Sequence, residues 1–131
     1  MSNRVSLSSK MRDKHVLSEA LNQLGIKHEV CEEDAVIVDY WSKEVTNKAS
    51  IKVSKYVGFE ADSEGKLRMV GDTHYENGLL AKPKAIDKVE QVYKAVNVYN
   101  TLQNAGYNAE ADFSNCATAE EIHVVAEVNF Q

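Results

Sequence analysis

The chain has 131 residues, of which 44% are hydrophobic and 27% charged, and its formal net charge is −5. This balance is typical of a single globular domain and excludes a disordered or strongly basic chain. Its apolar runs are far shorter than the roughly twenty residues that a membrane helix needs. We therefore expect one soluble cytoplasmic domain with no membrane partner, for which nucleic acid is a disfavoured partner. Cys31 and Cys116 are expected to be free thiols in a reducing compartment.

The N-terminal segment predicts a strand followed by a helix. Residues 4–9 alternate between apolar and polar side chains, as on a half-buried strand. Asp13 is a favourable N-cap, and the helix that follows it should end at Gly25, because glycine enters the left-handed conformation without a steric penalty. The apolar stripe of this helix has the i, i+3, i+4, i+7 spacing and consists of Leu17, Ala20, Leu21 and Leu24.

Four strands are predicted next, over residues 26–31, 35–41, 49–60 and 67–72. The acidic residues 32–34 should form the turn between the first two strands. Lys55 interrupts the apolar face of the third strand, which predicts a bulge or a break there. Residues 62–65 have the composition of a hairpin turn that leads into the fourth strand.

A second helix and two strands complete the chain. Pro83 suits the first turn of a helix, and Gly106 should end this helix as Gly25 ends the first. Residues 107–111 then predict a strand, and residues 122–130 contain the cleanest alternation in the sequence. The helix–glycine–strand unit therefore occurs twice, which predicts two helices laid on one sheet.

The predicted order of elements is β-α-β-β-β-β-α-β-β. Two helices with one apolar stripe each can cover only one face of a mostly antiparallel sheet, so the fold class is α+β. We expect a single domain over residues 1–131, built as a two-layer sandwich with both helices on one face of the sheet. The strands at 49–60 and 122–128 should contribute to one common core.

Short motifs spread over residues 5–128 resemble those of a known family. They are Gly58-Phe59, Gly65-Lys66-Leu67, Gln91-Val92-Tyr93 and Gly106-Tyr107-Asn108. The chain resembles the ycf-thirty-five-like family of plastid genomes and cyanobacteria, which has phage and bacterial relatives (domain of unknown function twelve-fifty-seven). That family offers no established catalytic residues. Because its genes often lie near that of an AAA-class ATPase, the resemblance implies an accessory role with such a partner, in cytoplasm, plastid stroma or phage-infected cytoplasm.

One cluster has residue types that could support catalysis. Asp72, His74 and Glu76 alternate, so in an extended segment they project from one side. Carboxylates with an imidazole can transfer protons or hold a hydrolytic metal, although a solvated strand end would have the same pattern. His28 and Cys31 lack the further ligands of a zinc site. We expect no cofactor, no catalytic residue and no bound metal.

The second face of the predicted sheet is a candidate interaction surface. It carries Lys52, Ser54, Tyr56, Arg68 and Val70 and, from the last strand, His123, Val125 and Glu127. Tyr40 and Trp41 are adjacent, so on a strand one of them points outward. Apolar anchors within a polar rim suit a protein–protein contact.

We therefore predict a small non-enzymatic binding or regulatory protein that docks onto a protein partner or onto a second copy of itself. The predicted partner-binding residues are Tyr40, Trp41, Lys52, Tyr56, Arg68 and His123. Two alternatives stay open. One is a metal-dependent enzyme that uses Asp72, His74 and Glu76. The other is a nucleic-acid-binding module with a basic face of Lys52, Lys55 and Arg68.

Overall fold

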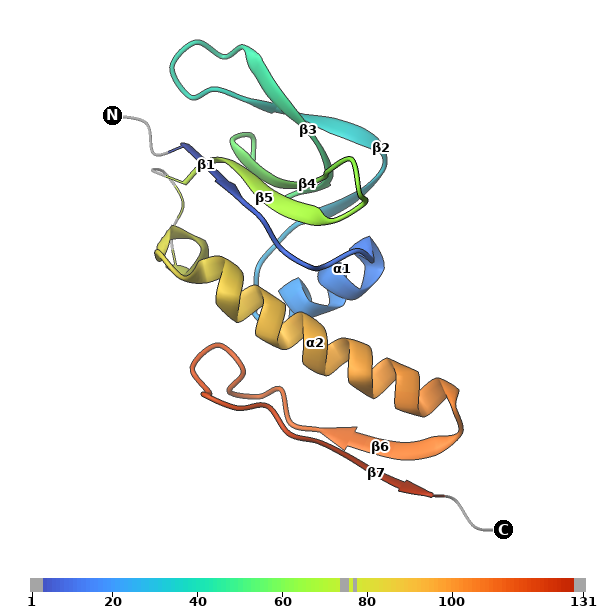
Figure 1. Cartoon of the computed structure of the whole chain (residues 1–131). Coiled ribbons are helices and arrows are strands. Elements are labelled where there is room, and N and C mark those ends of the chain that lie inside the picture. Colours follow the sequence, from blue (N-terminus) through green and yellow to red (C-terminus); the bar gives the residue numbers. More distant parts are fainter. Residues whose placement is uncertain (1–3, 74–75, 77, 129–131) are drawn as a thin grey trace.

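The computed structural model describes residues 4–73, 76 and 78–128. Its elements, in chain order, are β1 (Arg4–Leu7), α1 (Lys14–Gln23), β2 (Glu29–Val38), β3 (Val45–Lys52), β4 (Val57–Ala61), β5 (Leu67–Asp72), the short 3-10 helix η1 (Gly78–Ala81), α2 (Ala85–Asn104), β6 (Tyr107–Ala111) and β7 (Val124–Val128) (Figure 1). The predicted α+β class and the predicted order of strands and long helices are both confirmed.

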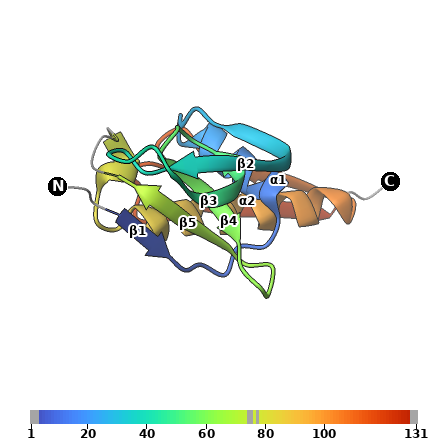
Figure 2. The ribbon, with the colours of Figure 1, turned by 90° about the horizontal axis from the view of Figure 1, so that it is seen from above.

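The strands form two sheets. The main sheet has five strands in the order β1-β5-β4-β3-β2, and each neighbouring pair is antiparallel. Strands β6 and β7 pair only with each other among the described strands and form a second sheet. Both helices lie on one face of the main sheet, as predicted, and the β6–β7 hairpin lies on the far side of α2 (Figure 1). Figure 2 looks down on the molecule with the main sheet nearest the viewer, so the strands of this sheet lie in front of α2.

The expectation that the last strand joins the main sheet is wrong, and the long helix α2 explains why. Its first half packs into the main core through Ala85 and Val89. Further along, Val92 and Val96 pack instead with Cys116, in a second cluster that includes part of α1. A helix that is apolar along two faces needs cover on both. The β6–β7 hairpin therefore covers α2 from the side that the main sheet leaves open.

The main core lies between the helices and the main sheet. Its buried members are Met11, Leu17, Leu21, Ile51, Val57, Phe59, Leu67, Met69, Leu80, Ala85 and Val89. Helix α1 is oriented into this core by local signals that the sequence contains. The Asp13 carboxylate accepts hydrogen bonds from the backbone N–H groups of His15 and Val16. At the other end, Gly25 has a φ of 71° and turns the chain toward β2.

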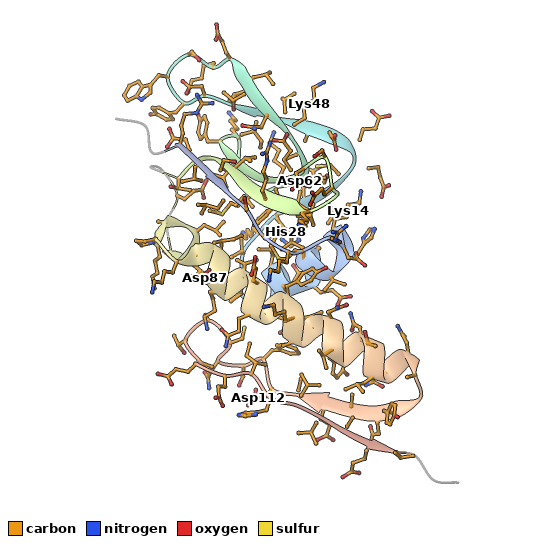
Figure 3. The ribbon with its side chains drawn as sticks, in the orientation of Figure 1. Lys14, His28, Lys48, Asp62, Asp87 and Asp112 are labelled. Atoms are coloured by element: carbon orange, nitrogen blue, oxygen red, sulfur yellow. The ribbon has the colours of Figure 1, made fainter. Side chains whose placement is uncertain are left out.

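One predicted turn is wrong, and one predicted break in a strand is confirmed. Strand β2 runs through residues 31–34, which bulge out opposite Ser50 instead of forming a turn. Lys14 of α1 (Figure 3) holds this bulge, because its Nζ donates to the carbonyl oxygen of Cys31 at 2.9 Å. The segment predicted over 49–60 is split by a turn at 53–56, which confirms the predicted break near Lys55. Because the two strands predicted over 26–31 and 35–41 form the single strand β2, the predicted number of strands is still correct.

Candidate functional site

Strands β2 and β3 form one end of the main sheet. Their hairpin curls over the face of this sheet that the helices leave free. Gly58 points toward this face, because both of its neighbours along β4 point into the main core. A Cβ atom added to Gly58 would lie 2.8 Å from the Cβ of Ala49 and 3.1 Å from Cδ1 of Ile37. Ala49 and Ile37 are fully buried there, and Val70, the neighbour of Gly58 on β5, is 1% exposed. The predicted open docking face is therefore closed at its centre.

The six predicted partner-binding residues fall in four separate places. Arg68 lies within the covered face, with its Nη2 3.5 Å from Oε1 of Glu60. Lys52 lies opposite Glu29 in the β2–β3 ladder. His123 precedes β7, in the other sheet, with its Nε2 3.3 Å from Oε2 of Glu121. These three residues do not form one surface.

The other three residues do meet, at the turn of the β2–β3 hairpin. The ring centroid of Tyr40 lies 5.1 Å from that of Trp41 and 5.2 Å from that of Tyr56, and both pairs meet edge to face. Lys43 completes the group, because its Nζ lies 4.3 Å from the centroid of the Tyr40 ring and donates to the Tyr56 hydroxyl oxygen at 3.1 Å. Edge-to-face rings and a cation over a ring are both attractive arrangements. We call Tyr40, Trp41, Lys43 and Tyr56 the aromatic tip.

Asp39 holds the turn that carries the aromatic tip. Its Oδ2 accepts hydrogen bonds from the backbone N–H groups of Trp41 and Ser42, at 3.0 and 2.9 Å. Lys43 adopts a φ of 59° and its N–H donates to the Asp39 carbonyl oxygen. The backbone hydrogen bond from Ser42, followed by that from Trp41, holds the pKa of Asp39 below its ordinary value, with a further contribution from Arg4. The turn is thus stabilised by the ionised form of Asp39.

Exposure within the aromatic tip is uneven. Trp41 is 62% exposed, whereas Tyr40 and Tyr56 are half-buried. The Tyr40-Trp41 pair lies in the turn after β2 and not on the strand predicted over 35–41, and Trp41 is its outward member. Val45, at the start of β3, adds a further exposed apolar side chain. The arrangement presents a large apolar side chain from a base that the Asp39 carboxylate holds by hydrogen bonds.

The predicted cluster of Asp72, His74 and Glu76 is only partly within the described residues, because His74 lies outside them. Asp72 is 1% exposed, and its N–H donates to the carbonyl oxygen of Tyr56. Glu76 accepts a hydrogen bond from Ser54 Oγ at 2.5 Å. Among the residues that the structure describes, no three His, Cys, Asp or Glu side chains are placed to hold a metal ion.

A serine–histidine pair was not anticipated from the sequence. Ser18 Oγ lies 2.6 Å from Nε2 of His28, while Nδ1 of His28 lies 2.8 Å from the carbonyl oxygen of Ile26. Since a carbonyl oxygen only accepts, Nδ1 donates to the Ile26 carbonyl, and the Ser18 hydroxyl is within hydrogen-bond distance of Nε2. These bonds tie α1 to the segment that enters β2. Both ring nitrogens of His28 are engaged, so it is not poised as a zinc ligand beside Cys31.

Both cysteines are buried free thiols, in agreement with the sequence analysis. Burial raises the pKa of the Cys116 thiol, although the nearby Lys88 opposes this effect. A thiol with a raised pKa is mostly protonated at neutral pH and is therefore a poor nucleophile. Cys116 acts as an apolar packing residue between α1 and α2, and its Sγ donates to the carbonyl oxygen of Gln23.

Comparisons with known proteins add no relative from which a site could be transferred. No protein-family model, no curated protein and no solved structure matches this chain. Within the described ranges, neither helix combines the length and the hydropathy needed to cross a membrane. The aromatic tip and its hydrogen bonds are therefore the basis on which a function can be proposed.

Proposed function

We propose that this protein is a non-enzymatic binding or regulatory protein that docks onto a protein partner through the aromatic tip. The observation that supports the proposal is the 62% exposure of Trp41 on a turn fixed by Asp39. Tryptophan and tyrosine are enriched among the residues that dominate binding energy in protein interfaces. An anchor that is already ordered loses little conformational entropy on binding.

The neighbours of Trp41 favour a partner with an acidic, apolar pocket. Lys43 gives the aromatic tip a cation that lies against Tyr40 and Tyr56, where it can pair with a carboxylate at the rim of such a pocket. The resemblance to the ycf-thirty-five-like family supports an AAA-class ATPase as the partner. Neither the metal-dependent nor the nucleic-acid alternative has a comparable observation in its favour, since Glu76 bonds Ser54 and Arg68 pairs with Glu60.

Replacing Trp41 tests the proposal. Affinity capture with Trp41→Ala should lose the AAA-class ATPase that wild-type protein retrieves, with affinity reduced about 30-fold or more, as expected for a central interface residue. Val36→Ala is the matched control, because Val36 is an exposed apolar residue (43%) on the same hairpin. It should retain the partner.

Trp41 also provides a direct readout of docking, because it is the only tryptophan in the chain. Its fluorescence should shift to shorter wavelength when the purified ATPase is titrated into the wild-type protein, since docking removes the indole from water. If Trp41→Ala remains folded and retrieves every wild-type partner in equal yield, the aromatic tip is not the docking site.

A further inference from the structure

The β6–β7 hairpin leaves one strand edge open. Strand β7 pairs with β6 on one side, and on its other side the described chain supplies no strand. The corresponding edge of β6 is partly covered, because Gln103 Nε2 donates to the carbonyl oxygen of Ala109 at 3.3 Å. Natural proteins commonly protect such edges with lysine, proline or a bulge. Residues 124–128 contain none of these, and β7 pairs with β6 in continuous register.

The apolar side of β7 continues beyond the helix that it covers. Ala126 is paired with Ala109, which is 4% exposed and faces α2, so Ala126 and its second neighbours face the same way. Yet Val128 is 56% exposed, and Val98 on α2 is 48% exposed. Beside them, a groove of about 610 Å³ runs between α2 and the start of β7, and its lining includes Asp87 (labelled in Figure 3), Val98, Ile122 and Val124. An exposed apolar strip next to an open strand edge is a site for β-strand addition.

We propose that the strand that occupies this edge is β7 of a second copy of the chain, paired antiparallel about Val125. In this register Val125 lies opposite itself, Val124 opposite Ala126, and His123 opposite Glu127. The apolar side then meets an apolar side, and the polar side has a histidine–carboxylate pair at each end. The second strand lies over the groove and over Val98, and the two hairpins become one four-stranded sheet.

Neighbouring registers are less favourable, which is why the proposal specifies one. Centring the pair on Val124 would place Glu121 opposite Glu127, and like charges directly opposite each other are destabilising. Centring it on Ala126 would place Glu127 opposite Val125 and leave the carboxylate without the imidazole. A register shifted by a single residue would mix the two sides of the strand. In the single chain His123 already lies 3.3 Å from Glu121, and both side chains are more than three-quarters exposed.

Sedimentation of the full chain at micromolar concentrations tests the proposal. Wild type should sediment as a dimer, and Val125→Lys should weaken dimerisation about 30-fold or more, because it places two ammonium groups opposite each other at the two-fold axis. Val125 is 60% exposed, so the variant should remain folded. Val45→Lys is the matched control, since Val45 is 55% exposed on the other hairpin, and it should stay dimeric.

A charge exchange tests the register itself. His123→Glu should weaken the dimer by placing it opposite Glu127, and adding Glu127→Lys in the same chain should restore it. Trp41→Ala should leave the dimer intact, which separates this proposal from that of the aromatic tip. A monomeric wild type at these concentrations, a Val125→Lys variant that dimerises as wild type does, or a charge exchange without rescue would overturn the proposal.

Discussion

The two hairpins of this protein lie on opposite sides of the helices and are stabilised in different ways (Figure 1). The β2–β3 hairpin contributes two fully buried side chains, Ile37 and Ala49, to the outer face of the main sheet. Polar contacts add to this, because Asn47 Nδ2 donates to Glu60 Oε2 at 2.7 Å. In the β6–β7 hairpin only Ala109 is buried among the strand residues.

The outer edges of the two hairpins also differ, because that of β2 is protected against pairing with another strand and that of β7 is not. The outer edge of β2 has a bulge at residues 31–34 and three exposed acidic side chains there, which discourage pairing with another strand. The edge of β7 is regular and has a single charge, at Glu127. A two-stranded hairpin is marginally stable alone. One hairpin is therefore completed within the chain, whereas the other has the features of a sheet that is completed between chains.

The largest expected effect is on the hairpin that is completed within the chain. Ile37→Ala should lower the free energy of unfolding by about 2–5 kcal/mol, because it leaves a cavity beneath the hairpin. Val125→Ala in β7, measured at dilution where the chain is monomeric, should change it by less than about 0.5 kcal/mol, because that side chain is mostly in solvent. Urea denaturation of both variants measures the difference. Equal losses would mean that the two hairpins are equally integrated.

A smaller effect is expected at the contact between the β2–β3 hairpin and β4. A Cβ at Gly58 would lie 2.6 Å from the Ile51 carbonyl oxygen and 2.8 Å from the Ala49 Cβ. Gly58→Ala should therefore destabilise the protein by about 1–3 kcal/mol through overpacking. Adding Ala49→Gly should recover part of this loss, and a double-mutant cycle gives the coupling between the two positions. If the losses of stability from Gly58→Ala and Ala49→Gly simply add, the two positions are not coupled and the hairpin does not pack against Gly58.

Local signals made much of this fold predictable. The N-cap at Asp13 and the glycines at Gly25 and Gly106 mark the ends of the two helices, because each acts within a few residues of its own position. The bulge in β2 was predicted as a turn, since exposed acidic residues are found in both. The place of β6 and β7 could not be derived in this way. It depends on which side of α2 remains uncovered, and only the packed molecule determines that.

The candidate site was predictable to the same degree. Their residue types alone mark Tyr40, Trp41 and Tyr56, and they meet because a turn brings the end of β2 toward the segment between β3 and β4. The sequence does not mark Lys43, because its role depends on that meeting. Asp39 could have been found, since aspartate side chains often hydrogen-bond the backbone two residues on and so form a turn. Val70 was expected on an open face, and the hairpin that covers it could not be inferred from alternation alone.

The smallest expected effect concerns the turn beneath the aromatic tip. Because the folded pKa of Asp39 is below its unfolded value, its contribution is complete above the unfolded pKa and is lost as the pH falls through the folded pKa. The fluorescence anisotropy of Trp41 should therefore decrease in acid, as protonation weakens the hydrogen bonds from Ser42 and Trp41. Asp39→Asn is the control, because its amide oxygen can still accept hydrogen bonds but has no charge to lose. Identical acid titrations of the two proteins would show that the ionised carboxylate does not order the aromatic tip.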